Sequence, residues 1–230
     1  MKYEVIRSNR KTMALQVTAE GAVLVRAPRR CSGTDIQQFV ADHTDWILRQ
    51  QEKIQRRRDR AEAFSLKEAD PVSICGTVYP VHIVPGLKAR LFHGQLLLPC
   101  GEMDCIRAEI QRIAREQGRE WISQRLDQWA QTMGVSYTGL TISTARTRWG
   151  SCTRDGKIRI SLWLLFAEER AIDYVLVHEL SHRRHFDHSA AFWAEVGRAM
   201  PDYDRWRRYL RSFQEEPFLQ SLARKGKNHA

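Results

Sequence analysis

The chain has 230 residues, of which 43% are hydrophobic and 28% are charged, so an intrinsically disordered protein is not expected. Its net charge of +10 favours contact between a basic surface and nucleotides or nucleic acid, although no aromatic-basic binding motif accompanies the charge. Charged residues interrupt the start of the chain, and no apolar run approaches the roughly 20 residues that span a bilayer. With 5 cysteines and no CxxC pair, we expect a soluble cytoplasmic protein without a membrane partner.

The N-terminal region predicts a β-hairpin followed by one helix. Apolar residues alternate over 13–18 and recur over 22–28, with a glycine turn between the two runs. Ser32 or Thr34 can cap a helix whose apolar residues follow three- and four-residue steps and which continues to Arg60. Its run of arginines is interpreted as a solvated helix end or linker rather than a nucleic-acid site.

Residues 72–99 carry further strand patterns separated by glycine and proline, and we expect a meander that continues the first sheet. Pro80 and Pro85 should place their strands at a sheet edge, because proline cannot donate a ladder hydrogen bond. A long helical pattern then runs from about Met103 to Met133, with Gly134 as its C-cap.

The fold class predicted from these patterns is α+β. A mainly antiparallel β region with one helix occupies residues 1–101, and a second domain of helices and a small sheet occupies 102–222. The last residues, 223–230, are polar and basic and are expected to form a disordered tail.

The segment His178-Glu179-Leu180-Ser181-His182 carries the chemistry. Apolar residues at helical spacing around it predict a helix, which places both histidines one turn apart on the same side. Two imidazoles in this relation can bind one zinc ion, and Glu179, about 100° further round the helix, can reach a water on the metal without being a ligand. The segment therefore predicts a zinc-dependent hydrolase with Glu179 as its general base.

A catalytic zinc ion needs a third protein ligand and one open position. His188 lies six residues after His182, the separation found in metzincins, but no glycine occurs between these two histidines, so the chain is not a metzincin by pattern. His188 is favoured on this interval. His185, which continues the helix, and Glu195, which lies further along, remain alternatives.

Several further segments carry a resemblance to one family. They are Arg148-Trp149-Gly150-Ser151-Cys152, Ile158-Arg159-Ile160, the motif helix 172–182, His188-Ser189-Ala190-Ala191-Phe192-Trp193 and Pro201-Asp202-Tyr203. With these segments the chain resembles the YgjP-like metallopeptidases, which are related to SprT-like zinc proteases. The resemblance implies a zincin-like catalytic domain in which one Zn²⁺ is held by His178, His182 and His188. Ser161 and Ser181 depart from the family's common residues, and neither is a proposed ligand.

The strand expected over 157–161 precedes the motif helix. In zincins such a strand can align an extended peptide by main-chain pairing, and the alternation here suits an edge that accepts one. Ile158 and Ile160 are therefore candidate substrate contacts, with a plain sheet strand as the equal alternative.

Three more residues are candidates for roles at the site. Arg148 could stabilise an oxyanion or a phosphate. Tyr203 could donate to the transition state, although packing of its ring is an alternative. Asp173 could orient a histidine ligand or stabilise the start of the motif helix.

Three functions fit these residues. The preferred one is a zinc peptidase in which a zinc-bound water activated by Glu179 attacks a peptide bond of a protein or peptide substrate. A metal-dependent nucleotide or polyphosphate hydrolase (a pyrophosphatase) is the alternative, because Arg146, Arg148, Arg154 and Arg159 lie close to the motif. A non-catalytic, zinc-stabilised nucleic-acid-binding module is the third, with the helix 206–211 as its candidate patch, but Glu179 in an otherwise complete site favours catalysis.

Overall fold

The computed structural model describes residues 1–99 and 103–223, and within them the fold is α+β, as predicted. The chain divides into two compact units between Ala63 and Phe64. The boundary expected near residue 102 differs from this division, because Val72 and Leu96 share one hydrophobic core with Ile110 beyond it. Apart from Ala223, the expected tail 223–230 lies outside the described residues.

The N-terminal unit contains a three-stranded sheet of order β1-β3-β2. Strands β2 (Ala14–Val17) and β3 (Val23–Pro28) pair antiparallel, which confirms the predicted hairpin. Strand β1 (Glu4–Ser8) pairs parallel with β3 and was not predicted. Its residues are mostly exposed, so it has no alternating apolar pattern that the sequence could display.

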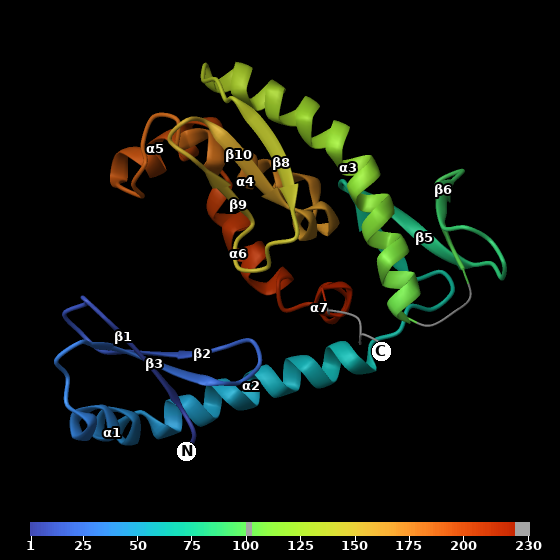
Figure 1. Cartoon of the computed structure of the whole chain (residues 1–230). Helices are drawn as coiled ribbons and strands as arrows, with labels where there is room; N and C mark the ends of the chain where they lie inside the picture. Colours follow the sequence, from blue (N-terminus) through green and yellow to red (C-terminus); the bar gives the residue numbers. More distant parts are fainter. Residues whose placement is uncertain (100–102, 224–230) are drawn as a thin grey trace. The chain divides into compact units, whose positions relative to one another are not determined.

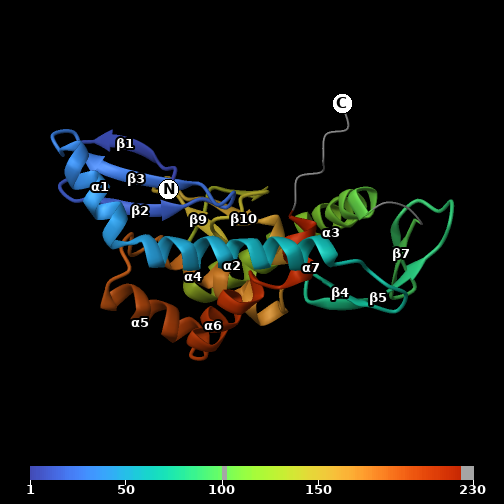
Figure 2. The same ribbon diagram turned by 90° about the horizontal axis from the view of Figure 1, so that it is seen from below.

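Two helices cover this sheet where one was expected (Figure 2). Ser32 caps α1 (Gly33–Asp42) by accepting a hydrogen bond of 3.0 Å from the backbone N–H of Asp35, which confirms one of the two predicted caps. The chain leaves the helix at His43, with φ −110° and ψ 12°, and α2 (Thr44–Ala63) begins after it. The buried apolar residues of this unit are Val23, Val25, Ala27, Ile36, Val40 and Ile47.

The second unit begins with a four-stranded sheet of order β4-β5-β7-β6. Its strands are β4 (Pro71–Ile74), β5 (Thr77–Ile83), β6 (Arg90–Phe92) and β7 (Gln95–Leu98). The expectation that these strands continue the first sheet is wrong, because they pair only with one another, and β5 and β7 pair in parallel.

The two prolines of this region do not mark an edge strand. Pro80 lies in β5, an inner strand, opposite Pro71 of β4. The pairing of β5 with β7 starts only at Val81, so Pro80 lies where β5 passes from one partner to the other. Pro85 follows the end of β5.

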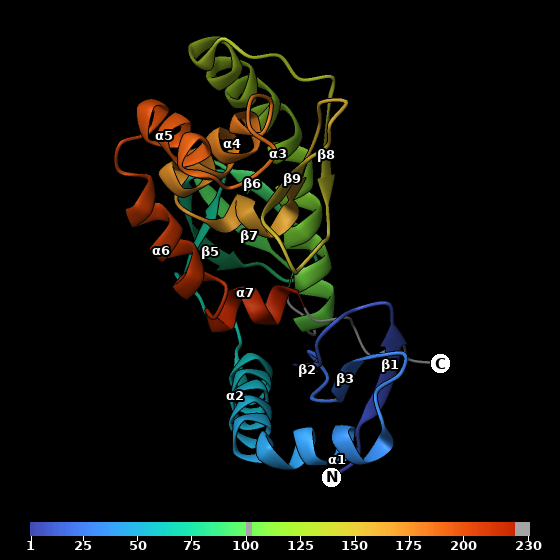
Figure 3. The same ribbon diagram turned by 90° about the vertical axis from the view of Figure 1, so that its left-hand side faces the viewer.

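Helix α3 (Met103–Met133) agrees with the predicted long helix. Gly134 follows it with φ +62°, and the N–H of Val135 donates to the carbonyl of Ala130 over 3.0 Å, as at a glycine C-cap. Near the start of α3 lies α7 (Pro217–Leu222), shown in Figure 3. The side chain of Gln111 donates to the carbonyl of Leu222 over 2.7 Å and joins the two helices.

The third sheet has the order β8-β10-β9 and lies over α4 (Glu169–Ser181) (Figure 1). Strand β10 (Lys157–Ser161) is its centre, parallel to β8 (Gly139–Ser143) and antiparallel to β9 (Gly150–Cys152). Between β10 and α4, the 3-10 helix η1 (Leu162–Phe166) consists entirely of buried residues.

Two further helices complete this unit, α5 (Ala190–Ala199) and α6 (Tyr203–Phe213). Trp206 and Leu210 of α6 are buried in the core, so this helix closes the unit with an apolar face. Among the described residues, no helix is both long enough and apolar enough to cross a membrane.

Candidate active site

Three histidine side chains meet at the C-terminal end of α4. His178 lies in the last turn of the helix and His182 is its C-cap residue, so the i, i+4 spacing places both rings on one side. His188 comes from the segment between α4 and α5. One ring nitrogen from each histidine lies within 4.8 Å of the other two, and the Nε2 atoms of His178 and His188 are 3.2 Å apart.

The turn that returns His188 to the helix is made without glycine. After Ser181, backbone N–H groups continue to donate to helix carbonyls, ending with His185 to Ser181 over 3.0 Å. The carboxylate of Asp187 then accepts from the N–H of Ser189 over 3.3 Å. The hydroxyl of Ser189 in turn caps α5. Local side-chain capping therefore replaces the glycine of the metzincin pattern.

The other two candidates for a third ligand do not join the three histidines. His185 contributes its backbone carbonyl, which lies 3.0 Å from Nδ1 of His182. Glu195 is only 5% exposed, and its carboxylate is bound by Arg184 and, over 2.9 Å, by Arg198. His185 and Glu195 thus contribute to the surroundings of the site, and the geometry favours His188 as the third metal ligand.

Aromatic rings enclose the histidines on the side of α5. The buried ring of Phe192 lies 4.9, 4.6 and 4.8 Å from the rings of His178, His182 and His188. Trp193 lies 5.8 Å from His178 and 5.9 Å from His188. Burial lowers the pKa of His178 to about 3, helped by the neighbouring histidines and Arg207, and it also lowers the pKa of His182. Neutral imidazoles keep the lone pairs that a metal ion requires.

The donor set fits a divalent metal ion. Because His182 Nδ1 donates to a carbonyl, its proton is fixed there and Nε2 keeps a free lone pair. His178 Nδ1 is buried and has no hydrogen-bond partner among the described residues. Tetrahedral zinc with Zn–N bonds of about 2.0–2.1 Å would separate its nitrogen ligands by about 3.3 Å, close to the 3.2 Å between His178 and His188.

Glu179 lies beside the histidines but outside their group. It is only 5% exposed, and burial raises the pKa of its carboxyl to about 8, while the positive charge of Arg148 opposes the rise. Strand β9 passes so close that a Cβ on Gly150 would lie 2.5 Å from Oε1 of Glu179. Glycine is therefore required at this position by the close approach of the carboxylate.

The strand next to Glu179 is β9. The prediction that the strand 157–161 offers an edge to a peptide is therefore corrected. Strand β10 is paired on both sides, so it offers no free edge. Ile158 and Ile160 are 1% and 0% exposed and belong to the core, so they do not contact a substrate. Strand pairing is a long-range property, and for this reason the alternating pattern could not distinguish a central strand from an edge.

Backbone pairing defines which groups of β9 face outward. The N–H of Thr153 donates to Lys157 over 3.0 Å, and the carbonyl of Trp149 accepts from Ser161 over 2.8 Å. In an antiparallel pair these hydrogen-bonding positions alternate, so the backbone groups of Gly150 and Cys152 point away from β10. They form a short free edge beside Glu179.

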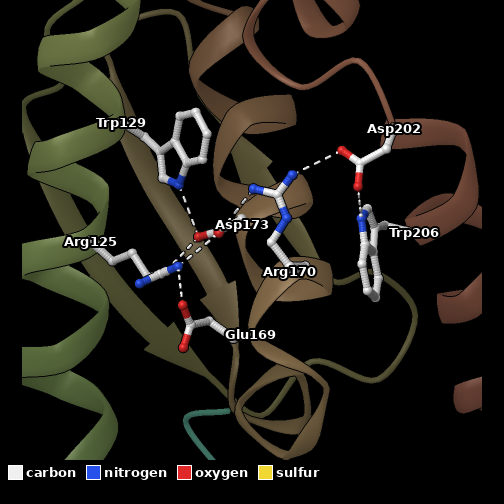
Figure 4. A network of polar contacts seen from close by, with 7 residues as sticks. All are labelled: Arg125, Trp129, Glu169, Arg170, Asp173, Asp202 and Trp206. Atoms are coloured by element: carbon white, nitrogen blue, oxygen red, sulfur yellow. Dashed lines mark hydrogen bonds and ion pairs between the residues drawn. The ribbon is translucent and has the colours of Figure 1, made fainter.

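Of the two roles predicted for Asp173, its contacts favour stabilising the first half of the motif helix over orienting a histidine. Its carboxylate, 1% exposed, is bound by Arg125 and accepts a hydrogen bond of 2.9 Å from the indole N–H of Trp129 (Figure 4). Among the described residues it makes no hydrogen bond to a histidine. Arg125 also binds Glu169, so the network fastens the first half of α4 to α3. The orienting contact for His182 comes instead from a backbone carbonyl.

Tyr203 packs rather than donates in this structure. Its ring stacks on Trp193 with centroids 5.4 Å apart and on Tyr174 at 6.4 Å. Its hydroxyl makes no hydrogen bond within the described part of the chain. Arg207, one turn further along α6, lies over the same Trp193 ring at 4.7 Å. The sequence analysis named Phe192 and Trp193 only as part of the resemblance and Arg207 only within the candidate patch 206–211, and it gave none of them a role at the metal site.

The chain is similar to a known protein family and to two solved structures. A family model described as the YgjP-like metallopeptidase domain matches residues 11–213. The crystal structure of the metallopeptidase zymogen abylysin of Pyrococcus abyssi is similar to this chain at 22% identity and a TM-score of 0.37, covering 40% of this chain and 92% of that one. The zymogen jannalysin of Methanocaldococcus jannaschii gives 14% identity and a TM-score of 0.36, covering 40% and 94%.

No curated protein matches the chain. The family model, by contrast, spans most of the sequence and includes all three histidines and Glu179. A metallopeptidase family implies a metal ion, and the three histidines form a group able to hold one. The chain therefore belongs to the YgjP-like family of metallopeptidases.

Proposed function

We propose that this protein is a zinc-dependent peptidase in which His178, His182 and His188 hold the metal and Glu179 is the general base. One observation carries the proposal: three imidazoles converge beside a buried carboxylate that has no hydrogen-bonded basic partner among the described residues. Three nitrogen ligands with an open fourth position are typical of catalytic zinc, whereas structural zinc sites are closed by four protein ligands.

The side chains around the ion have separate tasks in this proposal. A zinc ion bound there would polarise the substrate carbonyl and lower the pKa of a water molecule to near neutral. A carboxylate oxygen of Glu179 would take the proton from the attacking water and later deliver it to the leaving amine. Arg148, whose charge acts on Glu179, is a candidate for stabilising negative charge that develops on the substrate.

The free edge of β9 favours a peptide as the substrate. The outward backbone groups of Gly150 and Cys152 can pair with an extended chain, and Gly150 is in contact with Glu179. Main-chain pairing would thus bring a peptide bond to the catalytic residues independently of its side chains. The proposed nucleic-acid module has less in its favour, because Trp206 and Leu210 of the candidate patch are buried. The cytoplasmic location stays a prediction.

The test is cleavage of an unfolded protein such as casein by the metal-loaded enzyme. Glu179→Gln should reduce kcat by about a hundredfold or more, the range for loss of a general base, while zinc content is unchanged. A matched control is Glu195→Gln, which alters a buried glutamate that contacts arginines instead of the site. Cleavage that survives Glu179→Gln at the wild-type rate would contradict the mechanism.

A further inference from the structure

Three arginines lie next to the site: two flank strand β9 and one belongs to α6. Arg148 precedes β9 and acts electrostatically on Glu179. Arg154 follows β9 and lies 5.7 Å over the ring of Phe186. Arg207, from α6, lies 4.7 Å over the ring of Trp193.

Both aromatic rings connect these arginines to the histidines. Phe186 stacks on His182 at 6.3 Å between centroids and is 45% exposed, although it is a large apolar residue. Trp193 contacts His178 and His188, and the charge of Arg207 contributes to the lowered pKa of His178. The guanidinium groups of Arg154 and Arg207 are therefore at the border of the candidate active site.

None of these three arginines makes an ion pair with a carboxylate in the described part of the chain. Seven arginines elsewhere in the same unit are paired with acidic residues: Arg107, Arg112, Arg125, Arg170, Arg184, Arg198 and Arg208. Others, such as Arg183 and Arg205, make no ion pair among the described residues either, so what distinguishes the three is their position next to the histidines.

Three acidic residues that are close in sequence to the arginines or the histidines are already engaged. Asp155 pairs with Lys157 over 2.8 Å, and Asp204 pairs with Arg208 over 3.3 Å. Asp187 accepts from the N–H of Ser189. Asp187 keeps its negative charge, which acts on His182, but it makes no ion pair with the three arginines among the described residues, so their guanidinium groups remain available to a ligand.

We propose that Arg148, Arg154 and Arg207 select substrates that carry carboxylates near the scissile bond, so that the enzyme prefers acidic peptides. This inference rests on the proposed peptidase function. Arg148 and Arg154 lie two residues beyond either end of β9, so an extended peptide paired with Gly150 and Cys152 would run between them. Arginine can bind a carboxylate through two parallel hydrogen bonds, which suits side chains of aspartate and glutamate.

The arrangement favours a peptide over a polyphosphate. Arg148 and Arg154 flank opposite ends of β9 and Arg207 belongs to α6, and among the described residues no contact joins two of the three. Phosphate sites, in contrast, gather several donors around one group. Carboxylates spaced along an extended chain match donors spaced along a strand. A free strand edge between the donors can pair with the backbone of an extended peptide, whose carbonyl and N–H groups match its own.

The experiment compares three quenched fluorescent peptides that differ only at positions flanking the cleaved bond, with Glu, Gln or Lys. We expect kcat/KM to be about tenfold higher for Glu than for Gln, since two or three exposed ion pairs each contribute a few-fold, and lowest for Lys. Raising the salt concentration should reduce the advantage of the Glu peptide. Arg154→Ala and Arg207→Ala should each reduce the ratio of kcat/KM between the Glu and Gln peptides.

Arg205→Ala is the matched control. Arg205 is also on α6 and also lies over a tryptophan ring, 4.8 Å from that of Trp206, but Trp206 is bonded to Asp202 and does not contact the histidines. This variant should keep the full preference for Glu. If Arg205→Ala lost as much of the preference for Glu as Arg207→Ala does, the preference would reflect net charge alone, and the assignment would be overturned.

A binding measurement separates this inference from the proposed function. Fluorescence anisotropy of the labelled Glu and Gln peptides is measured with the Glu179→Gln variant, which does not depend on turnover. Tighter binding of the Glu peptide that Arg207→Ala weakens supports the inference even if no peptide is cleaved. Equal binding of both peptides contradicts it even if both are cleaved. Turnover of ATP or tripolyphosphate above that of every peptide would also overturn it, in favour of a phosphate substrate.

Discussion

The two halves of α4 differ in whether their buried polar groups have partners. In the first half, the buried carboxylate of Asp173 is bound by Arg125 and Trp129, and Arg170 binds Asp202 over 2.9 Å. In the second half, Glu179 is buried beside histidines and Gly150, and His178 Nδ1 has no partner among the described residues. A satisfied network fastens a helix, whereas unsatisfied buried groups are costly and persist where function requires them.

The first half should therefore determine stability, and Asp173→Ala is the strongest test. This change leaves the Trp129 indole N–H unpaired and removes one of the two carboxylates on Arg125. We expect the free energy of unfolding to fall by about 3 kcal/mol, the lower end for a broken buried pair, because Glu169 remains. Urea denaturation measures it.

The control for this prediction is Asp155→Ala. Asp155 is exposed and pairs with Lys157 at the surface, so its loss should change the unfolding free energy by less than about 1 kcal/mol. If the two variants unfolded at the same urea concentration, α4 would not depend on the Asp173 network.

The second half should determine activity, and Gly150→Ala addresses it without changing a polar group. The added Cβ would lie 2.5 Å from Oε1 of Glu179, so the carboxylate must move. We expect kcat/KM to fall by about a hundredfold, as for a displacement of about 1 Å at a catalytic group. Gly139→Ala in β8 is the control, because nothing lies within 4 Å of its Cβ. Equal activity of the two variants would show that β9 does not confine Glu179.

The sequence reveals those features of the two halves of α4 that depend on nearby residues. It does not reveal those that depend on contacts between residues far apart in the chain. Helix α3 is predicted well because periodicity and Gly134 are local signals. The spacing of His178 and His182 is equally local. The partner of Asp173 is not, since Arg125 lies 48 residues away on another helix. Nor could the sequence show that β10 is central and β9 an edge, because strand order arises only when distant segments pair.

A smaller effect is expected where the charges of α4 reach the surface. Arg170 and Asp202 are 47% and 43% exposed at their side chains. Arg170→Ala should therefore reduce the unfolding free energy by only about 0.2–1 kcal/mol, with high salt removing most of the difference. Thermal unfolding at low and high salt measures it. A loss as large as that of Asp173→Ala would contradict this ranking and would mean that Arg170, which lies 4.0 Å from Asp173, belongs to the network that fastens the helix.

The most direct test of the site is the metal content of four proteins after dialysis against zinc and removal of free metal. The account predicts one ion per chain in the wild type, in Glu179→Gln and in His185→Ala, whose imidazole lies outside the group of three histidines. It predicts loss of the ion in His188→Ala. Undiminished metal in His188→Ala, or loss of metal in His185→Ala with retention in His188→Ala, would contradict the assignment of the three ligands.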